Sequence, residues 1–195
     1  MRGLRVLIEG LSFRVSGGEA LELRGPNGSG KSTLLRILAG LTRQHAGTVK
    51  FAGPEEDVAV HYLGHADAVK PAESALEQAR FWASYFGRPR EAAQAALDRV
   101  GLAQRFDVPG RGLSAGQKRR LALTRLLIEP RPVWLLDEPT AALDVEGKKL
   151  VLDLVAEHRL TGGMVIAAIH GDGFQNSRTL DISDLKAPAD LMAPA

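Results

Sequence analysis

The sequence predicts an α/β protein with a parallel, three-layer sheet, because short apolar strands alternate with helices along the chain. Residues 19–25 (EALELRG) have the pattern of a strand that runs into a glycine-rich turn, and residues 31–41 (KSTLLRILAGL) that of the following helix. Residues 131–139 (RPVWLLDEP) contain a fully apolar strand of the kind that parallel sheets bury. In such a sheet, ligands bind at the carboxyl ends of the strands.

Other segments extend this alternation. Residues 58–64 (VAVHYLG) form a second predicted strand, in which apolar side chains at positions 58, 60 and 62 predict one well-buried face. A helix over about 145–160 and a strand over 164–170 (MVIAAIH) continue the pattern. Residues 177–185 (SRTLDISDL) are predicted to form a short terminal strand pair, and residues 186–195 a loose tail.

Length and composition limit the chain to one domain. Its 195 residues are 45% hydrophobic, which is enough to bury one core. With 25 basic and 23 acidic residues, the net charge of +2 gives no electrostatic reason to expect nucleic acid or anionic lipid as a partner. The absence of cysteine excludes disulfides and thiolate metal sites. No run of about 18 apolar residues occurs, and Glu9 interrupts the N-terminal apolar stretch, so neither a membrane span nor a signal peptide is predicted.

The turn after the first strand carries the strongest motif. The sequence GPNGSGKST matches the phosphate-binding loop G-x-x-x-x-G-K-[ST], in which backbone amides turn inward, the lysine reaches the β- and γ-phosphates and the hydroxyl ligates magnesium. A plain glycine-rich turn is the alternative, but the preceding strand and the following helix favour nucleotide binding. The predicted nucleotide-binding residues are Gly25, Pro26, Asn27, Gly28, Ser29, Gly30, Lys31, Ser32 and Thr33.

Two acidic residues end the apolar strand VWLLDEP. Asp137 is placed to hold magnesium through water together with Ser32, and Glu138 to polarise a water for attack on the γ-phosphate. Unpaired buried carboxylates are costly, so two of them after four apolar residues predict a functional strand end. The motifs therefore predict a nucleoside triphosphate and Mg²⁺ as cofactors, and the predicted catalytic residues begin with Lys31 and Glu138.

Between these two motifs, the stretch LSAGQKRR (residues 113–120) narrows the class of NTPase. It resembles the signature of ATP-binding-cassette (ABC) ATPases, with Ala115 where the family usually has glycine, and Ser114, Gly116 and Gln117 in register. Taken alone, the pentapeptide could be an ordinary helix N-cap. The resemblance implies a head-to-tail homodimer, in which the signature of one subunit closes over the ATP held by the other.

The same resemblance assigns roles to further residues. AALD places Asp144 in the D-loop at the dimer seam, and His170, at the end of its strand, corresponds to the switch histidine that contacts the γ-phosphate. His65 stands where the family carries the Q-loop glutamine. Since a neutral imidazole can exchange one hydrogen bond with metal-bound water, His65 is predicted to be a working catalytic and metal-site residue.

The resemblance also implies a domain organisation. Composition changes to alanine, glutamate and arginine with helical spacing from about residue 73 to 101. We expect a single ABC ATPase domain over 1–195, with a nucleotide-binding core at 1–70 and 110–195 and a helical subdomain at 71–109. Four aromatic side chains of this subdomain are predicted to form its core rather than a contact surface, namely Phe81, Trp82, Tyr85 and Phe86.

YLGHADAVKP, LSAGQ and the short chain resemble one branch of the family, the ATP-binding subunit of the haem exporter of cytochrome c maturation. This implies a membrane permease and further maturation proteins as partners, no nucleic acid, and a peripheral position on the cytoplasmic face of the bacterial inner membrane. Whether haem or a haem chaperone is the cargo stays open. The alternatives are a soluble ABC ATPase acting on nucleic acid or ribosomes, and a nucleotide-gated module with little turnover.

Two features of the sequence depart from the pattern of these families. ABC ATPases carry an aromatic residue before the phosphate loop that stacks on adenine, and here Phe13 lies too far along. Either adenine loses about 0.5–1.5 kcal/mol of stacking or the true start lies upstream. Gln78 and Ala79 occupy positions where relatives tend to carry asparagine and leucine.

Overall fold

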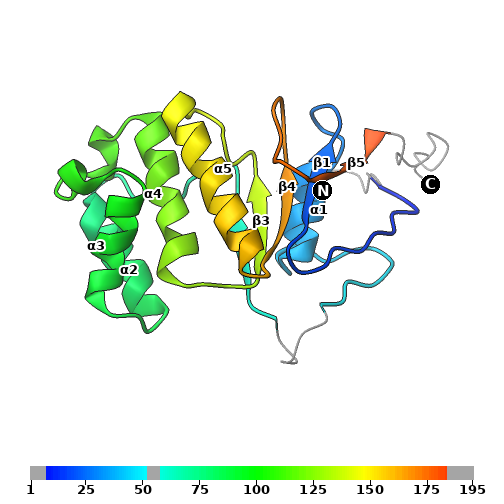
Figure 1. Ribbon diagram of the computed structural model, residues 1–195, viewed down its shortest axis with the longest axis horizontal. Helices are drawn as coiled ribbons and strands as arrows, with labels where there is room; N and C mark the ends of the chain where they lie inside the picture. Colours follow the sequence, from blue (N-terminus) through cyan, green and yellow to red (C-terminus); the bar gives the residue numbers. More distant parts are fainter. Residues whose placement is uncertain (1–7, 52–57, 184–195) are drawn as a thin grey trace, which may run out of the picture.

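The computed structural model describes residues 8–51 and 58–183 of the chain (Figure 1). The predicted tail at 186–195 therefore lies outside the described residues. The elements are β1 (Ala20–Arg24), α1 (Lys31–Leu38), β2 (Val60–Leu63), α2 (Ala75–Tyr85), α3 (Arg90–Arg99), α4 (Ala115–Ile128), β3 (Val133–Asp137), α5 (Val145–Leu160), β4 (Met164–Ala168) and β5 (Arg178–Asp181), with short 3₁₀ turns at Ala103–Arg105 and Gly110–Gly112.

The five strands of the described residues form one sheet in the order β2-β3-β4-β1-β5, and every neighbouring pair is parallel. The register places Leu63 beside Leu136 and Asp137 beside Ala168, so the carboxyl ends of β2, β3 and β4 are level. All of these ends therefore open onto one edge of the sheet, where the α/β prediction expects a ligand.

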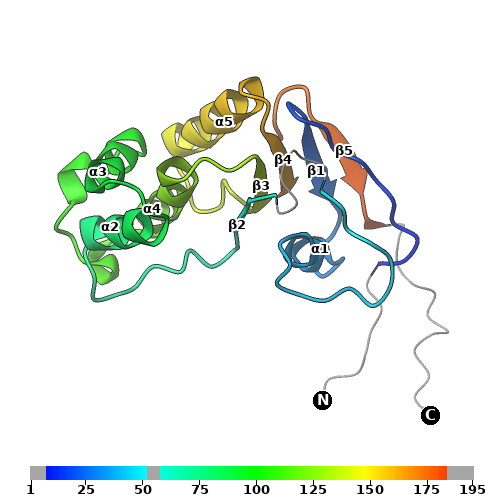
Figure 2. The same cartoon turned by 90° about the horizontal axis from the view of Figure 1, so that it is seen from below.

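Helices cover both faces of this sheet, which confirms the predicted three-layer α/β architecture. Figure 2 shows α1 on one face and α5 on the other. The side chains of β3 alternate between these layers, because Val133 and Leu135 belong to the cluster around α1 while Trp134 and Leu136 belong to the cluster that includes α4 and α5. This alternation follows from the pleat of the strand.

Two predictions about strands are wrong in detail. The predicted pair of strands within residues 177–185 is wrong, because residues 178–181 form the single strand β5. This strand pairs with the edge of β1, in parallel, through backbone hydrogen bonds. In β2, the predicted apolar face is only partly buried, whereas His61 and Leu63 on the opposite face are almost fully buried. The strand is therefore covered on both sides, as parallel strands usually are.

Helices α2 and α3 pack against α4 to form a helical subdomain at the far end of the molecule from β5 (Figure 1). Alanines at the contact, such as Ala79, Ala83 and Ala93, are fully buried and let the helices approach closely. The two ends of the segment meet, because the Gly110 amide donates to Glu73 O at 2.9 Å. The exact domain boundaries stay a prediction.

The aromatic side chains on α2 do not form a closed core. Phe81 is 47% exposed and Tyr85 69% exposed, while Trp82 and Phe86 pack partly buried against the core. The prediction of a core role is therefore wrong for Phe81 and Tyr85. The helix can bury only one stripe because α3 and α4 pack against its alanines.

Candidate functional site

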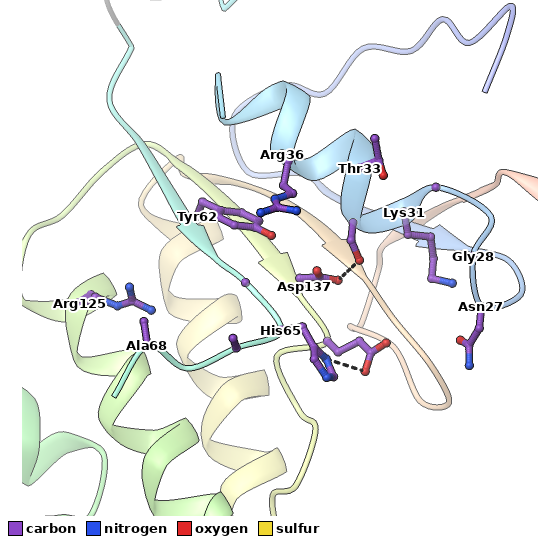
Figure 3. Close-up of a pocket in the computed structure, with 15 residues that line it drawn as sticks. Asn27, Gly28, Lys31, Thr33, Arg36, Tyr62, His65, Ala68, Arg125 and Asp137 are labelled. Carbon is purple, nitrogen blue, oxygen red and sulfur yellow. Dashed lines mark hydrogen bonds and ion pairs between the residues drawn. The ribbon is translucent and has the colours of Figure 1, made fainter. Parts of the chain in front are cut away.

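A pocket of about 770 Å³ opens at the carboxyl edge of the sheet (Figure 3). Residues from the phosphate loop and α1 form one wall, and Tyr62 of β2 together with residues 64–66 and 68 of the following loop forms another. Asp137 and Glu138 at the end of β3 also line it. Segments that are distant in sequence thus meet where the sheet topology predicts a ligand.

The loop between β1 and α1 has the backbone that a phosphate cradle requires. Gly25, Gly28 and Gly30 all have positive φ values, of 140°, 78° and 107°, which other L-residues rarely adopt. A Cβ at Gly25 would lie 3.1 Å from Ser29 Oγ, so the loop also leaves little room for a side chain there. No side chain caps the N-terminus of α1, which leaves its first amides and its positive dipole end toward the pocket.

Lys31 and Ser32 are held at the start of α1. The buried Lys31 donates from Nζ to Gly25 O at 2.7 Å and to Pro26 O at 3.0 Å, so its ammonium group lies across the loop. Ser32 Oγ donates to Asp137 Oδ1 at 3.0 Å (Figure 3). A hydroxyl and a carboxylate oxygen, both hard ligands, therefore meet between the phosphate loop and β3.

Glu138 lies between two histidines. Its Oε2 is 3.5 Å from His65 Nδ1, drawn as a dashed line in Figure 3, and its Oε1 is 3.4 Å from His170 Nε2. The Glu138 backbone has φ of 51°, a left-handed conformation that is strained for a residue with a side chain. Its amide donates to Ala168 O at 3.1 Å, which fixes the turn against β4.

The predicted signature residues start helix α4 and do not line the pocket. Ser114 is the N-cap: its Oγ accepts from the Gln117 amide at 3.2 Å, and Gln117 Oε1 accepts from the Ser114 amide at 3.0 Å. This reciprocal pair is a capping box. A Cβ at Gly116 would lie 3.0 Å from Ala142 O, so the helix start fits closely against the segment before Asp144.

Asp144 likewise caps a helix. Its Oδ1 accepts from the Gly147 amide at 2.8 Å and from Arg120 Nη2 at 2.8 Å, which joins the start of α5 to α4. These bonds, first that from Gly147 and then that from Arg120, lower the pKa of Asp144 below its ordinary value. The side chain is 69% exposed, and its role at a dimer seam stays a prediction.

Sequence reasoning missed Arg119, which is 2% exposed and donates to the segments on both sides of the pocket. The signal was present in the helix pattern, because Arg119 shares a face with Ala122, Leu123 and Leu126 at spacings of three, four and seven. A charge within an apolar stripe indicates a buried ion. Tyr62 and Arg36 also line the pocket and were not predicted.

That Phe13 lies too far along to serve as the adenine-stacking residue stays a prediction. Phe13 is partly buried against the cluster around α1. Tyr62, by contrast, contributes its aromatic ring to the lining of the pocket.

Comparison with known proteins identifies the family. The family described as ABC transporter matches residues 8–141. A cytochrome c biogenesis ATP-binding export protein CcmA from Paramagnetospirillum magneticum is 52% identical, over 88% of this chain and 84% of that protein. The protein of the same name from Rhodopseudomonas palustris (strain BisB5) is 49% identical, over 87% of each chain.

Solved structures agree on the fold. An ABC transporter ATP-binding protein from Pyrococcus furiosus superposes with a TM-score of 0.80, at 22% identity and 92% coverage of both chains. A dimeric ATP-binding cassette in a post-hydrolysis state, bound to ADP and phosphate, gives 0.78 at 23% identity, covering 88% of this chain and 83% of that one. The chain therefore belongs to the ABC transporter family, as an ATP-hydrolysing member related to the cytochrome c biogenesis ATP-binding export proteins.

Proposed function

We propose that this chain is the ATP-hydrolysing subunit of a membrane complex that serves cytochrome c biogenesis, either exporting haem or releasing a haem chaperone. Relatives about half identical over most of the chain carry names from that process and support this assignment. The observation that carries the hydrolytic part is the position of the Glu138 carboxylate, which lines the phosphate-loop pocket between His65 and His170.

In this proposal the phosphate loop, Gly25 to Thr33, binds the triphosphate. Its amides and the N-terminus of α1 offer hydrogen bonds and a positive dipole end to the phosphate oxygens. Lys31 would exchange its bonds to the Gly25 and Pro26 carbonyls for bonds to the β- and γ-phosphates. Its buried position places the charge inside the loop, where it neutralises charge on the transferred group.

Magnesium is the metal that the residues fit best. Ser32 Oγ and Asp137 Oδ1, 3.0 Å apart, supply the hydroxyl and carboxylate oxygens that it prefers, and His65 lies at the same edge of the pocket. In the described part of the chain, no three histidine or carboxylate side chains form a metal cage. This matches an ion held by few protein ligands together with substrate phosphates. When bound, it would neutralise charge developing on the phosphate oxygens.

Glu138 would accept a proton from the attacking water, with His65 and His170 on either side of it. His170 would contact the γ-phosphate from the end of β4. His65 would hold either the attacking water or a metal-bound water beside it. Because both imidazoles lie within 3.5 Å of the carboxylate, they also set its orientation. His65 is then a working substitute for the family's glutamine, and His65→Ala is expected to lower turnover.

The remaining predicted residues serve assembly in this proposal. Ser114, Ala115, Gly116 and Gln117 present the start of α4 to the ATP of a second copy, and Asp144 lies at the seam. The exposed faces of these two helix starts support a homodimer. No helix in the described ranges has the length and apolar character to cross a bilayer. We place the subunit on the cytoplasmic face of the bacterial inner membrane, attached through a permease.

ATP hydrolysis tests the proposal, measured on the purified chain alone and after co-expression with the permease encoded beside it. The expected result is stimulation by the permease and loss of turnover in Glu138→Gln, which keeps the side chain's volume but cannot take a proton. Robust ATP turnover that is the same with and without the permease would favour a soluble ABC ATPase. ATP binding without turnover in the parent chain would favour a nucleotide-gated module.

A further inference from the structure

Arg119 is a buried cation next to the proposed catalytic site, and all of its side-chain donors form hydrogen bonds. Its guanidinium donates five hydrogen bonds, one from each N–H, which is the whole capacity of the group. Nε donates to Pro139 O at 3.2 Å, and Nη2 donates to Asp137 O and Glu138 O, both at 2.7 Å. Nη1 donates to Gly64 O at 2.8 Å and to Asp67 Oδ1 at 2.9 Å.

These acceptors belong to the two segments that carry the proposed catalytic side chains. Gly64 and Asp67 bracket His65 in the loop after β2, and the three carbonyls belong to the turn of Glu138 at the end of β3. The guanidinium is therefore a rigid bridge between the loop of one catalytic residue and the turn of the other.

The Glu138 turn needs such support. With φ at 51°, Glu138 occupies a backbone conformation that costs about 1–3 kcal/mol and persists only when its surroundings hold it. Arg119 binds the carbonyl of Glu138 and those of both its neighbours. Lysine could not replace this bridge, because three donors on a flexible stem cannot reproduce a planar fork with five.

We infer that Arg119 is a positioning residue for ATP hydrolysis, which holds the His65 loop against the Glu138 turn so that the imidazole and the carboxylate stay in contact. This inference rests on the proposed function of Glu138 and His65. Arg119 itself is buried and is not among the residues that line the pocket.

The test compares Arg119→Lys with Arg99→Lys in the full chain, in the assembly that hydrolyses ATP. Arg99 forms an ion pair with Glu157 on the exposed surface and is the matched control. For Arg119→Lys we expect kcat to fall about tenfold or more, while the affinity for ATP changes less than about threefold. The control should keep both values. A kcat within about twofold of the parent, or equal losses in kcat and ATP affinity, would overturn the inference.

A second measurement separates positioning from simple loss of stability. If Arg119 acts through His65, then His65→Ala should lower kcat in the parent but have little further effect in Arg119→Lys. An undiminished effect of His65→Ala in that background would contradict the inference. Should Arg119→Lys not fold, Asp67→Asn takes its place, because it removes the negative charge that Arg119 Nη1 contacts and leaves the size of the side chain unchanged. We expect Asp67→Asn to lower kcat about threefold at unchanged ATP affinity, and an unchanged kcat would count against the bridge.

Glu138→Gln, measured in parallel, distinguishes a failure of the proposed catalytic site from a failure of the role inferred for Arg119. If Glu138→Gln keeps turnover, the proposed site is wrong. If Glu138→Gln abolishes turnover and Arg119→Lys preserves it, only the role of Arg119 fails.

Discussion

Lowering the pH should destabilise this protein through His61, a histidine that lies in β2 away from the nucleotide pocket. The side chain is 6% exposed, its Nε2 lies 2.6 Å from Glu129 O, and the ring meets Phe86 edge to face at 5.8 Å. Burial lowers the pKa of His61 from 6.5 to about 4, against the opposing effect of the bond to Glu129 O. The folded protein therefore holds this imidazole in its neutral form.

The magnitude follows from linkage. The unfolded chain binds a proton at His61 below about pH 6.5, but the folded chain does so only near pH 4. The stabilising contribution is fully present above pH 6.5 and is lost as the pH falls toward 4. At about 1.4 kcal/mol for each pH unit, the total is about 3 kcal/mol, of which about 2 kcal/mol is lost by about pH 5.

Urea unfolding at about pH 7.5 and about pH 5 measures this loss. Other groups also titrate in this range, so the comparison is with His61→Gln, whose amide can still donate to Glu129 O but does not titrate. We expect the free energy of unfolding to fall by about 2 kcal/mol more in the parent than in the variant. Equal pH dependence in the two proteins would refute the reasoning.

Three substitutions test local packing and capping by the same unfolding measurement. Ser114→Ala removes the N-cap of α4 and should cost about 1 kcal/mol, whereas Ser114→Asp, which can cap, should cost less. Glu22→Gln should cost about 2 kcal/mol, because the carboxylate accepts from the Phe174 amide and the Ser177 hydroxyl, both at 2.6 Å. Gly163→Ala should cost about 1–3 kcal/mol, since its Cβ would lie 2.2 Å from the His158 ring, and His158→Ala should remove this extra cost.

The motif residues could be predicted because their chemistry is local in the sequence. The phosphate loop is recognised in the sequence by glycines and a lysine at fixed spacing. Gly25, Gly28 and Gly30 do adopt the conformations that glycine permits. The strand ending in Asp137 was visible as four apolar residues followed by acids. In each case a short window contains both the element and the reason for its ending.

The missed features depend on which surfaces meet in space. Periodicity predicted a buried face for β2 but could not show that His61, on the opposite face, is the more deeply buried side chain. Helical spacing also predicted that the aromatic residues of α2 form a core. No sequence rule indicates that the alanines of this helix take that contact and leave Tyr85 exposed. The helix pattern indicates that Arg119 is buried, but it could not show its five partners, because these come from two distant segments.

Sheet register explains how two histidines that are distant in sequence meet at the Glu138 carboxylate. Leu63 pairs with Leu136 and Asp137 pairs with Ala168, so two steps beyond Leu63 the chain reaches His65 at the level of Glu138. On the other side, His170 lies two residues beyond Ala168. A shift of one residue in either pairing would turn the following side chain to the opposite face. The contacts around Glu138 therefore depend on strand pairing as much as on residue identity, and a single residue inserted between Leu63 and His65 should separate the imidazole from the carboxylate even with every motif intact.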